Sequence, residues 1–367
     1  MLSSPPATPP GRPPVGPADC DREDAPANGL DLRAAIVAIA SHGLVGAAID
    51  PPGGPLPDVS WGRLLHGVRC HGLEAHLIEV ISHGHLRVRD AQHEQARRAH
   101  VEATARALVL QEELLRCVDL LREAGIDYRV LRGLALAHLV YPKPVLRSHA
   151  ASIDLLVRSH DLDAAVATLT RNGAERARPL RYGFNRRFGK AVRLRLPSGV
   201  HVYLHRTLAP GPFGKRVESA ELFETRSVFE AGDRTLLSLG LEELLIESCY
   251  TAVLSDDPLR LVALRDVAEL CLSGGLDATR VETLAARWGS IAALSRGIAL
   301  AWETFRLADV VPLSVRANRF VPTRREQRLL GAYEPRTVRV LAATKVERGR
   351  PAESRRRTRR FPLGGES

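Results

Sequence analysis

A single carboxylate, Asp154, lies within the apolar run Ile153–Val157 and is the residue of this chain best placed to do chemistry. It follows a shorter apolar run at Tyr128–Leu131, a glycine at Gly133 and a helical stretch, so the expected order is strand, turn, helix and returning strand. Gly133 permits a positive φ or a close backbone approach where the chain leaves the first strand. Because the N–H groups at the start of the next helix would face that point, the sequence predicts an anion there.

Two further segments, Ala191–Leu196 and Val200–His205, alternate strictly between apolar and polar residues on either side of a Pro-Ser-Gly turn. This alternation predicts a β-hairpin with one face in the core. The other face would carry Arg193, Arg195, His201, Tyr203 and His205. The hairpin and the two runs around Gly133 together predict a small mixed sheet.

Composition and periodicity divide the remaining chain around this sheet. The N-terminal end is rich in proline and poor in large apolar side chains, and the region before the sheet has helical periodicity that ends at Gly125. No packed structure is expected beyond about Pro322. The predicted units are residues 1–28 (disordered, Pro-rich), 29–125 (helical), 126–239 (α/β core), 240–315 (helical) and 316–367 (Arg-rich tail, mostly disordered).

The stretch from Leu131 to Val157 resembles the nucleotidyltransferase family of the DNA polymerase beta-like nucleotidyltransferase superfamily. That family carries a Leu-Lys-Gly turn, a Tyr-Pro and Arg segment, and Asp-Ile-Asp-Leu-Leu-Val. The matching residues here are Leu131-Arg132-Gly133, Tyr141-Pro142, Arg147 and Ser152-Ile153-Asp154-Leu155-Leu156-Val157. A weaker likeness extends from about Trp61 to Trp302 and includes Glu269 as a helical acidic residue. The resemblance implies an α+β fold, with a polymerase beta-like core of a small mixed sheet and helices between N- and C-terminal helical units.

Nucleotidyl transfer normally uses two divalent ions held by carboxylates on adjacent strands. The resemblance implies three such acids, and two of them are replaced in this sequence by Ser152 and Tyr203. Ser152 and Asp154 would still share one face of the strand, because strand side chains alternate. A neutral hydroxyl and a protonated phenol leave about one negative charge for two divalent ions, so a two-metal site is not expected.

The resemblance also implies roles for individual residues. Asp154 would be catalytic and the protein ligand of a weakly held Mg²⁺ or Mn²⁺ ion that arrives with the nucleotide. Arg132, Gly133, Arg147 and Ser152 would bind the nucleotide, and His205 would orient a hydroxyl or act as a base. Two structural alternatives stay open: His205 as a hydrogen-bonded strand-end histidine, and Asp154 as an acid that caps a neighbouring turn.

Two functions remain open from the sequence. In the first, the protein is a nucleotidyltransferase that moves a nucleoside monophosphate from a nucleoside triphosphate to a small-molecule or peptide acceptor with a reduced metal site. In the second, it is a catalytically inactive protein of the same fold that binds a nucleotide or a partner. The sequence specifies neither the acceptor nor the base.

The net charge of +10 is concentrated in the C-terminal tail, where residues 316–367 contain 14 Arg and one Lys against five Glu. Such a segment is expected to contact polyanions, and a solvated tail with no partner is the alternative. The start of the chain lacks a basic and apolar leader, and no apolar run is long enough for a membrane helix. These features predict a cytoplasmic protein that has no contact with membranes.

Overall fold

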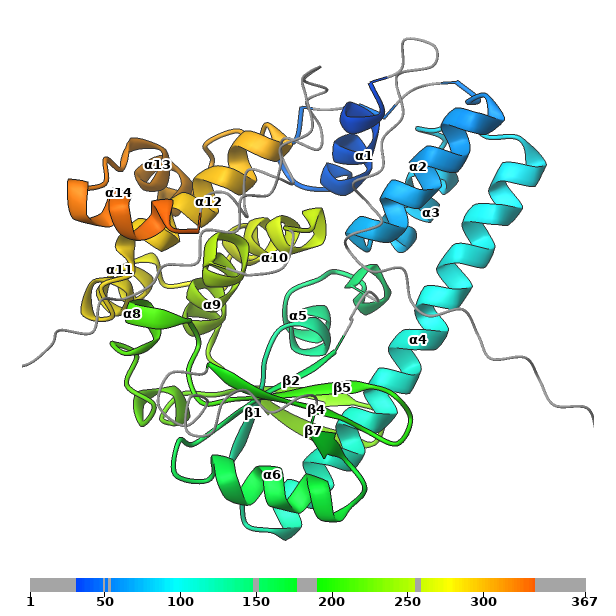
Figure 1. The fold of residues 1–367 in the computed structure, drawn as a ribbon. Coiled ribbons are helices and arrows are strands. Elements are labelled where there is room, and N and C mark those ends of the chain that lie inside the picture. Colours follow the sequence, from blue (N-terminus) through cyan, green and yellow to red (C-terminus); the bar gives the residue numbers. More distant parts are fainter. Residues whose placement is uncertain are drawn as a thin grey trace, which may run out of the picture.

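The computed structural model describes residues 31–48, 50–51, 54–147, 152–176, 190–254 and 259–333. Within these ranges one mixed sheet of seven strands has the order β3-β4-β5-β2-β1-β7-β6. The strands are β1 (Tyr128–Val130), β2 (Ile153–Val157), β3 (Glu175–Arg176), β4 (Ala191–Arg195), β5 (His201–His205), β6 (Ser227–Ala231) and β7 (Arg234–Ser238). Helices cover both faces of this sheet (Figure 1). The predicted α+β fold with a small mixed sheet is therefore confirmed.

Strand β2 lies in the middle of the sheet, where it runs antiparallel to β1 and parallel to β5. The register of β2 and β5 places Asp154 directly opposite Tyr203. The predicted hairpin consists of β4 and β5, with Val192 opposite Leu204. Because side chains alternate along a strand, the apolar neighbours of Asp154 point to the other face.

The apolar face of the sheet packs against α6 (Leu162–Arg171), which lies below it in Figure 1. It also packs against the C-terminal part of α4 (Asp90–Glu123), a helix that runs from the upper right of the view down past the sheet. Leu155 belongs to the same buried cluster as Leu121 of α4 and Val166 of α6. Helix α4 is followed by Gly125, whose φ of 68° fits the predicted helix end. The amphipathic pattern of the strands thus fixes which face of the sheet is covered and which face carries Asp154.

The face with Asp154 lies under the helical part of the molecule (Figure 1). Helices from both ends of the described chain share one buried cluster, which contains Ile39 of α1, Leu64 of α2, Leu244 of α9 and Ile298 of α12. The N-terminal and C-terminal helical segments therefore form one packed body. The elements involved are α1 (Leu32–Ser41), α2 (Asp58–His71), α3 (Glu74–Ser82), α5 (Gly133–Leu139), η2 (Pro144–Arg147), α8 (Gly211–Gly214), η3 (Glu221–Phe223), α9 (Leu241–Leu254), α10 (Leu261–Leu272), α11 (Ala278–Arg287), α12 (Ile291–Phe305), α13 (Pro312–Arg319) and α14 (Arg324–Gly331).

The expectation that no packed structure follows Pro322 is wrong for the first part of the tail. Helix α14 begins with a capping box, in which Thr323 and Glu326 bond each other's backbone N–H groups, and Leu330 is buried. Helix α13 also crosses the predicted unit boundary at residue 316. The many charged residues of this segment obscure the amphipathic pattern of a short helix in the sequence. Such a helix needs only one or two apolar contacts to pack. The rest of the tail and residues 1–28 lie outside the described residues, so their predicted disorder and the polyanion contact of the tail stay predictions.

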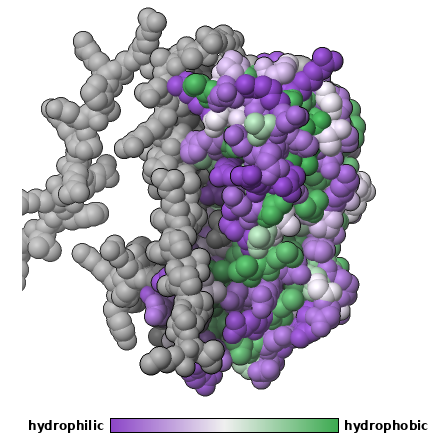
Figure 2. Space-filling view, turned by 90° about the vertical axis from the view of Figure 1, so that its right-hand side faces the viewer, coloured by the Kyte–Doolittle hydropathy of each residue, from purple (hydrophilic) through white to green (hydrophobic). Residues whose placement is uncertain are grey.

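The long helix α4 presents part of its apolar surface to the outside. Val101, Leu108 and Val109 are exposed there, and Val145 of η2 is exposed as well. Figure 2, which views this side of the molecule, shows apolar patches interrupted by hydrophilic side chains. Within the described residues, no helix combines the length and the apolar character that a membrane crossing requires.

Glu74 at the start of α3 is 2% exposed, and Arg106 of α4 lies 3.5 Å from its carboxylate. Burial raises the pKa of Glu74 from 4.5 to about 7, although Arg106 opposes this. Because the folded protein binds this proton more tightly than the unfolded chain, stability should fall as the pH rises from about 4.5 to 7 and then level off. We expect Glu74→Gln to remove that decline and to stabilise the protein at pH 8 by about 1–3 kcal/mol. Urea unfolding at pH 5 and pH 8 measures this, and equal pH slopes for both proteins would contradict it.

Candidate functional site

Asp154 lies at the centre of a hydrogen-bond network on the helical side of the sheet. Its Oδ1 accepts from Arg132 Nη2 at 2.6 Å and from His205 Nε2 at 2.7 Å, and its Oδ2 accepts from Ser152 Oγ at 3.1 Å. Burial works against ionisation, but the Arg132 guanidinium and the His205 hydrogen bond hold the pKa of Asp154 well below its usual range. Asp154 is therefore a carboxylate at neutral pH, and both of its oxygens have protein donors.

Arg132 joins this carboxylate to a second one. Its Nε lies 3.3 Å from Glu247 Oε1 on α9, and its Nη1 donates to Thr251 Oγ1 at 3.2 Å. Arg132 has a φ of 51° and a ψ of −161°, a conformation that favours glycine and costs about 1–3 kcal/mol for other residues. The chain turns sharply at this residue, between β1 and α5, and the turn directs the guanidinium between the two acids. The ion pairs hold the backbone in this strained form.

Glu247 is a site residue that the sequence analysis missed. Its side chain is 0% exposed, and it lies in the middle of α9, a helix that is buried on nearly every side. A carboxylate is rarely buried without a cationic partner, so an acid in such an apolar helical segment is itself a signal. The identity of the partner depends on the packing of α9 over the sheet, which the sequence does not show.

Ser152, Asp154 and Tyr203 lie on one face, as their spacing predicts. Ser152 donates to Asp154, and Tyr203 sits opposite Asp154 on β5. The guanidinium of Arg193 lies 5.8 Å from the centre of the Tyr203 ring, and the ring of His205 lies 6.2 Å away. At the position where the resemblance implies an acid, this chain therefore has an aromatic ring near a guanidinium and an imidazole.

His205 is buried and forms a dyad with Asp154. Burial is the main reason that its pKa is lowered to about 4, although the bond to Asp154 opposes this shift. Because an ionised carboxylate can only accept, the Nε2 atom of the neutral ring carries the proton. The Nδ1 atom is buried and has no hydrogen-bond partner among the described residues, so it could accept a proton only from a group that reaches the interior beside it. This geometry fits a general base as well as a structural histidine.

The carboxylate that Arg147 binds through its guanidinium is Asp266. The guanidinium forms two parallel bonds to Asp266 on α10, from Nε to Oδ1 at 2.7 Å and from Nη2 to Oδ2 at 2.8 Å. Tyr141 donates to the same Oδ1 at 2.7 Å. The Tyr-Pro and Arg segment thus binds η2 to α10. The acid in contact with it is Asp266, whereas Glu269 pairs with Arg265 at 2.8 Å.

A cavity of about 290 Å³ begins at this network and extends towards α4. Its polar end contains Gly133, Arg147, Ser152 and Asp154, which are four of the residues that the sequence analysis assigned to the site. Gly133 has a φ of 44°, in the region that its sequence position predicts. The apolar end is lined by residues of α4 and α5, among them Ala107, Leu108, Leu110, Leu114, Leu134 and Ala137. Its size lies at the lower end of the range for small-molecule pockets.

The sequence of residues 57–306 matches the profile of a family described as uncharacterised nucleotidyltransferases. The chain belongs to this family. A solved structure, that of an antigenic nucleotidyltransferase-like protein from Paracoccidioides brasiliensis, has 15% sequence identity and a TM-score of 0.31, over 54% of this chain and 92% of that one. No curated protein sequence matches the chain.

The residues around Asp154 do not supply the ligands that a resident divalent ion of a nucleotidyltransferase would require. Mg²⁺ requires oxygen ligands, and the only carboxylate on this face of β2 and β5 already accepts bonds from Arg132, His205 and Ser152. In the part of the chain that the structure describes, no group of three His, Cys, Asp or Glu side chains could hold a metal ion. The positive charge next to Asp154 and Glu247 is supplied by Arg132 instead.

Proposed function

We propose that this nucleotidyltransferase-family protein binds a nucleoside triphosphate beside Asp154, with Arg132 in the electrostatic place of a resident metal ion. The observation that carries the proposal is the double ion pair of Arg132, which reaches both Asp154 and Glu247. A guanidinium fixed in this way is a permanent positive charge beside two carboxylates, which is the charge that a metal ion would otherwise supply there. A divalent ion carried by the nucleotide would belong to the substrate.

The cavity beside this network supports a nucleotide as the ligand. Its wall from α4 and α5 is mostly apolar, with Thr104, Gln111 and His138 as the polar members, which suits a flat base that carries polar edges. Arg147, Ser152 and Asp154 offer polar contacts at one end. Leu108 lines the cavity and is exposed, so the cavity reaches the surface at this residue. This division into an apolar wall and a few polar groups is common in cofactor and nucleotide pockets.

One observation favours transfer as a second function. The Asp154–His205 dyad leaves a neutral imidazole with an unbonded Nδ1 atom next to the network. In a transfer reaction, the oxygen of a small-molecule or peptide acceptor would attack the α-phosphorus, pyrophosphate would leave, and the acceptor proton would pass to His205. Release of pyrophosphate with a panel of hydroxyl-bearing acceptors, lost in His205→Gln, would demonstrate this activity. Nucleotide binding without release across the panel would support a binding function alone.

Calorimetric titration of the four nucleoside triphosphates with the full chain tests the binding. We expect affinity in excess EDTA to stay within about threefold of that in Mg²⁺, because Arg132 rather than a bound ion supplies the positive charge. Binding that is absent in EDTA and appears only with Mg²⁺ would rule out this role of Arg132.

A matched pair of variants on α4 tests whether the nucleotide binds in this cavity or elsewhere on the chain. Ala107 lines the cavity, and Ala105 is exposed on the same helix outside the lining. We expect Ala107→Phe to fill the cavity and to weaken nucleotide binding at least about tenfold, and Ala105→Phe to leave it unchanged. Equal affinities for the two variants would place the nucleotide elsewhere.

A further inference from the structure

The outer face of α4 carries a stripe of side chains opposite the face that packs into the protein. The buried residues of the helix, among them Ala96, Ala103 and Leu114, lie on the inner face. On the outer face, side chains that reach solvent recur at spacings of three or four residues, which place them along one side of a helix. We call this set the outer stripe. It consists of Glu94, Arg98, Val101, Ala105, Val109, Glu112 and Arg116.

The middle of the outer stripe is apolar and exposed. Val101 is 53% exposed, Val109 is 48% exposed, and Leu108 beside them is 60% exposed. Helix α4 lies at one edge of the molecule, and no described segment covers these side chains (Figure 1). Single apolar residues are common on protein surfaces, but a group of them on one helix face indicates contact with another molecule.

The order of residues along the outer stripe is complementary to itself. From Glu94 to Arg116 the order is acid, base, Val, Ala, Val, acid, base, and the spacings are the same in both directions from Ala105. The reversed order is base, acid, Val, Ala, Val, base, acid. A second copy of the helix laid antiparallel about Ala105 therefore brings a base to each acid and a valine to each valine.

The charges favour this one register over the alternatives. In the antiparallel arrangement about Ala105, Arg98 faces Glu112 of the second copy, and Glu94 faces Arg116. A shift of one helical turn would bring Glu94 opposite Glu112 in one direction, or Arg98 opposite Arg116 in the other. A parallel pair would place every charge opposite the same charge. Like charges in contact repel, so these alternatives are disfavoured.

We propose that the outer stripe binds a second copy of this chain, with the two α4 helices antiparallel and Ala105 at the two-fold axis. Such a contact is self-complementary, so each charge pair occurs twice. The small side chain at the axis lets the helices approach closely, and the flanking valines bury one another. The stripe covers only about 33 Å of helix at 1.5 Å per residue. A contact of this size suits a weak dimer whose population depends on concentration.

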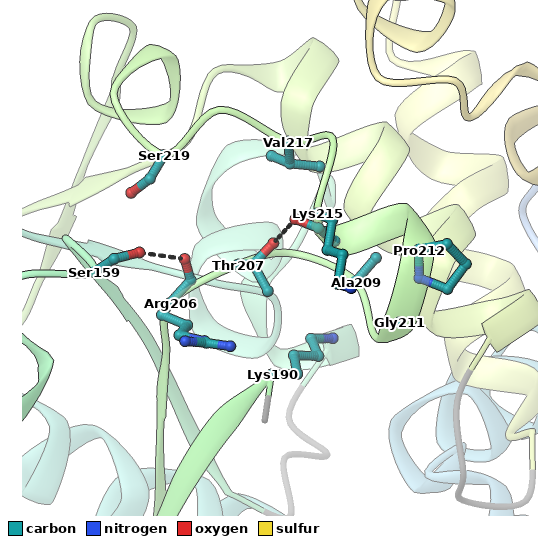
Figure 3. A pocket seen from close by; sticks show the side chains of 11 residues that line it. Ser159, Lys190, Arg206, Thr207, Ala209, Gly211, Pro212, Lys215, Val217 and Ser219 are labelled. Atoms are coloured by element: carbon teal, nitrogen blue, oxygen red, sulfur yellow. Dashed lines mark hydrogen bonds between the residues drawn. The ribbon is translucent and has the colours of Figure 1, made fainter. Parts of the chain in front are cut away.

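Sedimentation velocity of the full chain at about 1–100 µM tests the proposal, and the native protein should become increasingly dimeric over this range. Arg98→Glu and Glu112→Arg each place like charges opposite one another twice, so each should weaken the association at least about tenfold. The matched control is Glu218→Arg, which makes the same charge change as Glu112→Arg at an exposed position away from α4. It lies between Val217 and Ser219, which line a pocket near α8 (Figure 3), and it should dimerise like the native protein.

An equal mixture of the two α4 variants supplies the sharpest comparison. In a mixed dimer, one copy carries acids at positions 98 and 112 and the other carries bases at both. Every contact is then attractive again, so the mixture should associate within about threefold of the native protein. Misfolded variants could not recover association on mixing. A native protein that stays monomeric at about 100 µM, single variants that associate like the control, or a mixture that stays monomeric would each overturn the proposal.

Discussion

Arg132→Met should lower the free energy of unfolding by about 3–5 kcal/mol at pH 7, because it leaves the fully buried Glu247 without its cation. Asp154 would keep its bonds from His205 and Ser152, so the loss concerns mainly the α9 side of the network. Methionine retains much of the length of the arginine stem, which limits the cavity contribution to the loss. Urea unfolding measures the effect.

A double-mutant cycle isolates the ion pair from the change in packing. Glu247→Gln in the Arg132→Met background removes the unpaired charge, so we expect it to restore at least about 1 kcal/mol, whereas the same substitution in the native protein should be destabilising. Arg132→Lys should fall between Arg132→Met and the native protein, since an ammonium group cannot reach two carboxylates and Thr251 with the fork of a guanidinium. A cost below about 1 kcal/mol for Arg132→Met, or strict additivity in the cycle, would show that the pair does not stabilise the fold.

The combined change Ser152→Asp and Tyr203→Asp should create a response to divalent ions. Both positions share a face with Asp154, and position 203 lies directly opposite it in the β2–β5 register. Three neighbouring carboxylates repel one another, so the double variant should be less stable than the native protein without metal. Mg²⁺ or Mn²⁺ at a hundredfold excess over Kd should then stabilise it by about 2.7 kcal/mol, and the native protein much less.

Asp154→Asn in the same background provides the control, because it removes the central ligand and should abolish most of the metal response. Thermal unfolding with and without each ion is the measurement. If the double variant folds but neither ion raises its unfolding temperature, Arg132 would still be paired with Asp154 and would exclude the ion from the three carboxylates. Arg132→Met in that background would then be expected to restore the response, and its failure to do so would show that the three positions do not form a metal site.

The strand and hairpin pattern was available from the sequence, because it depends on local alternation. Ile153–Val157 and the Ala191–His205 hairpin have the period of two that a sheet with one covered face requires. The same period places Ser152 and Asp154 on one face. The end of α4 at Gly125 is likewise local, since a left-handed residue after a helix favours glycine. The short helix α14 was missed, because charge dominates its composition and a single buried leucine anchors it.

Only the tertiary structure determined which charge partners the polar residues of the site have. The sequence by itself determined that Asp154 is the one acid on its strand and that the expected partners at 152 and 203 are Ser and Tyr. It did not determine that Arg132 would bridge Asp154 to Glu247, or that Arg147 would bind Asp266, because each pair joins residues more than 100 positions apart or crosses between a strand and a turn. Ion pairing depends on distance and on the local dielectric environment, and both are set by how α9 and α10 pack over the sheet. Local periodicity therefore fixed the scaffold, and long-range packing fixed the charge partners of the site.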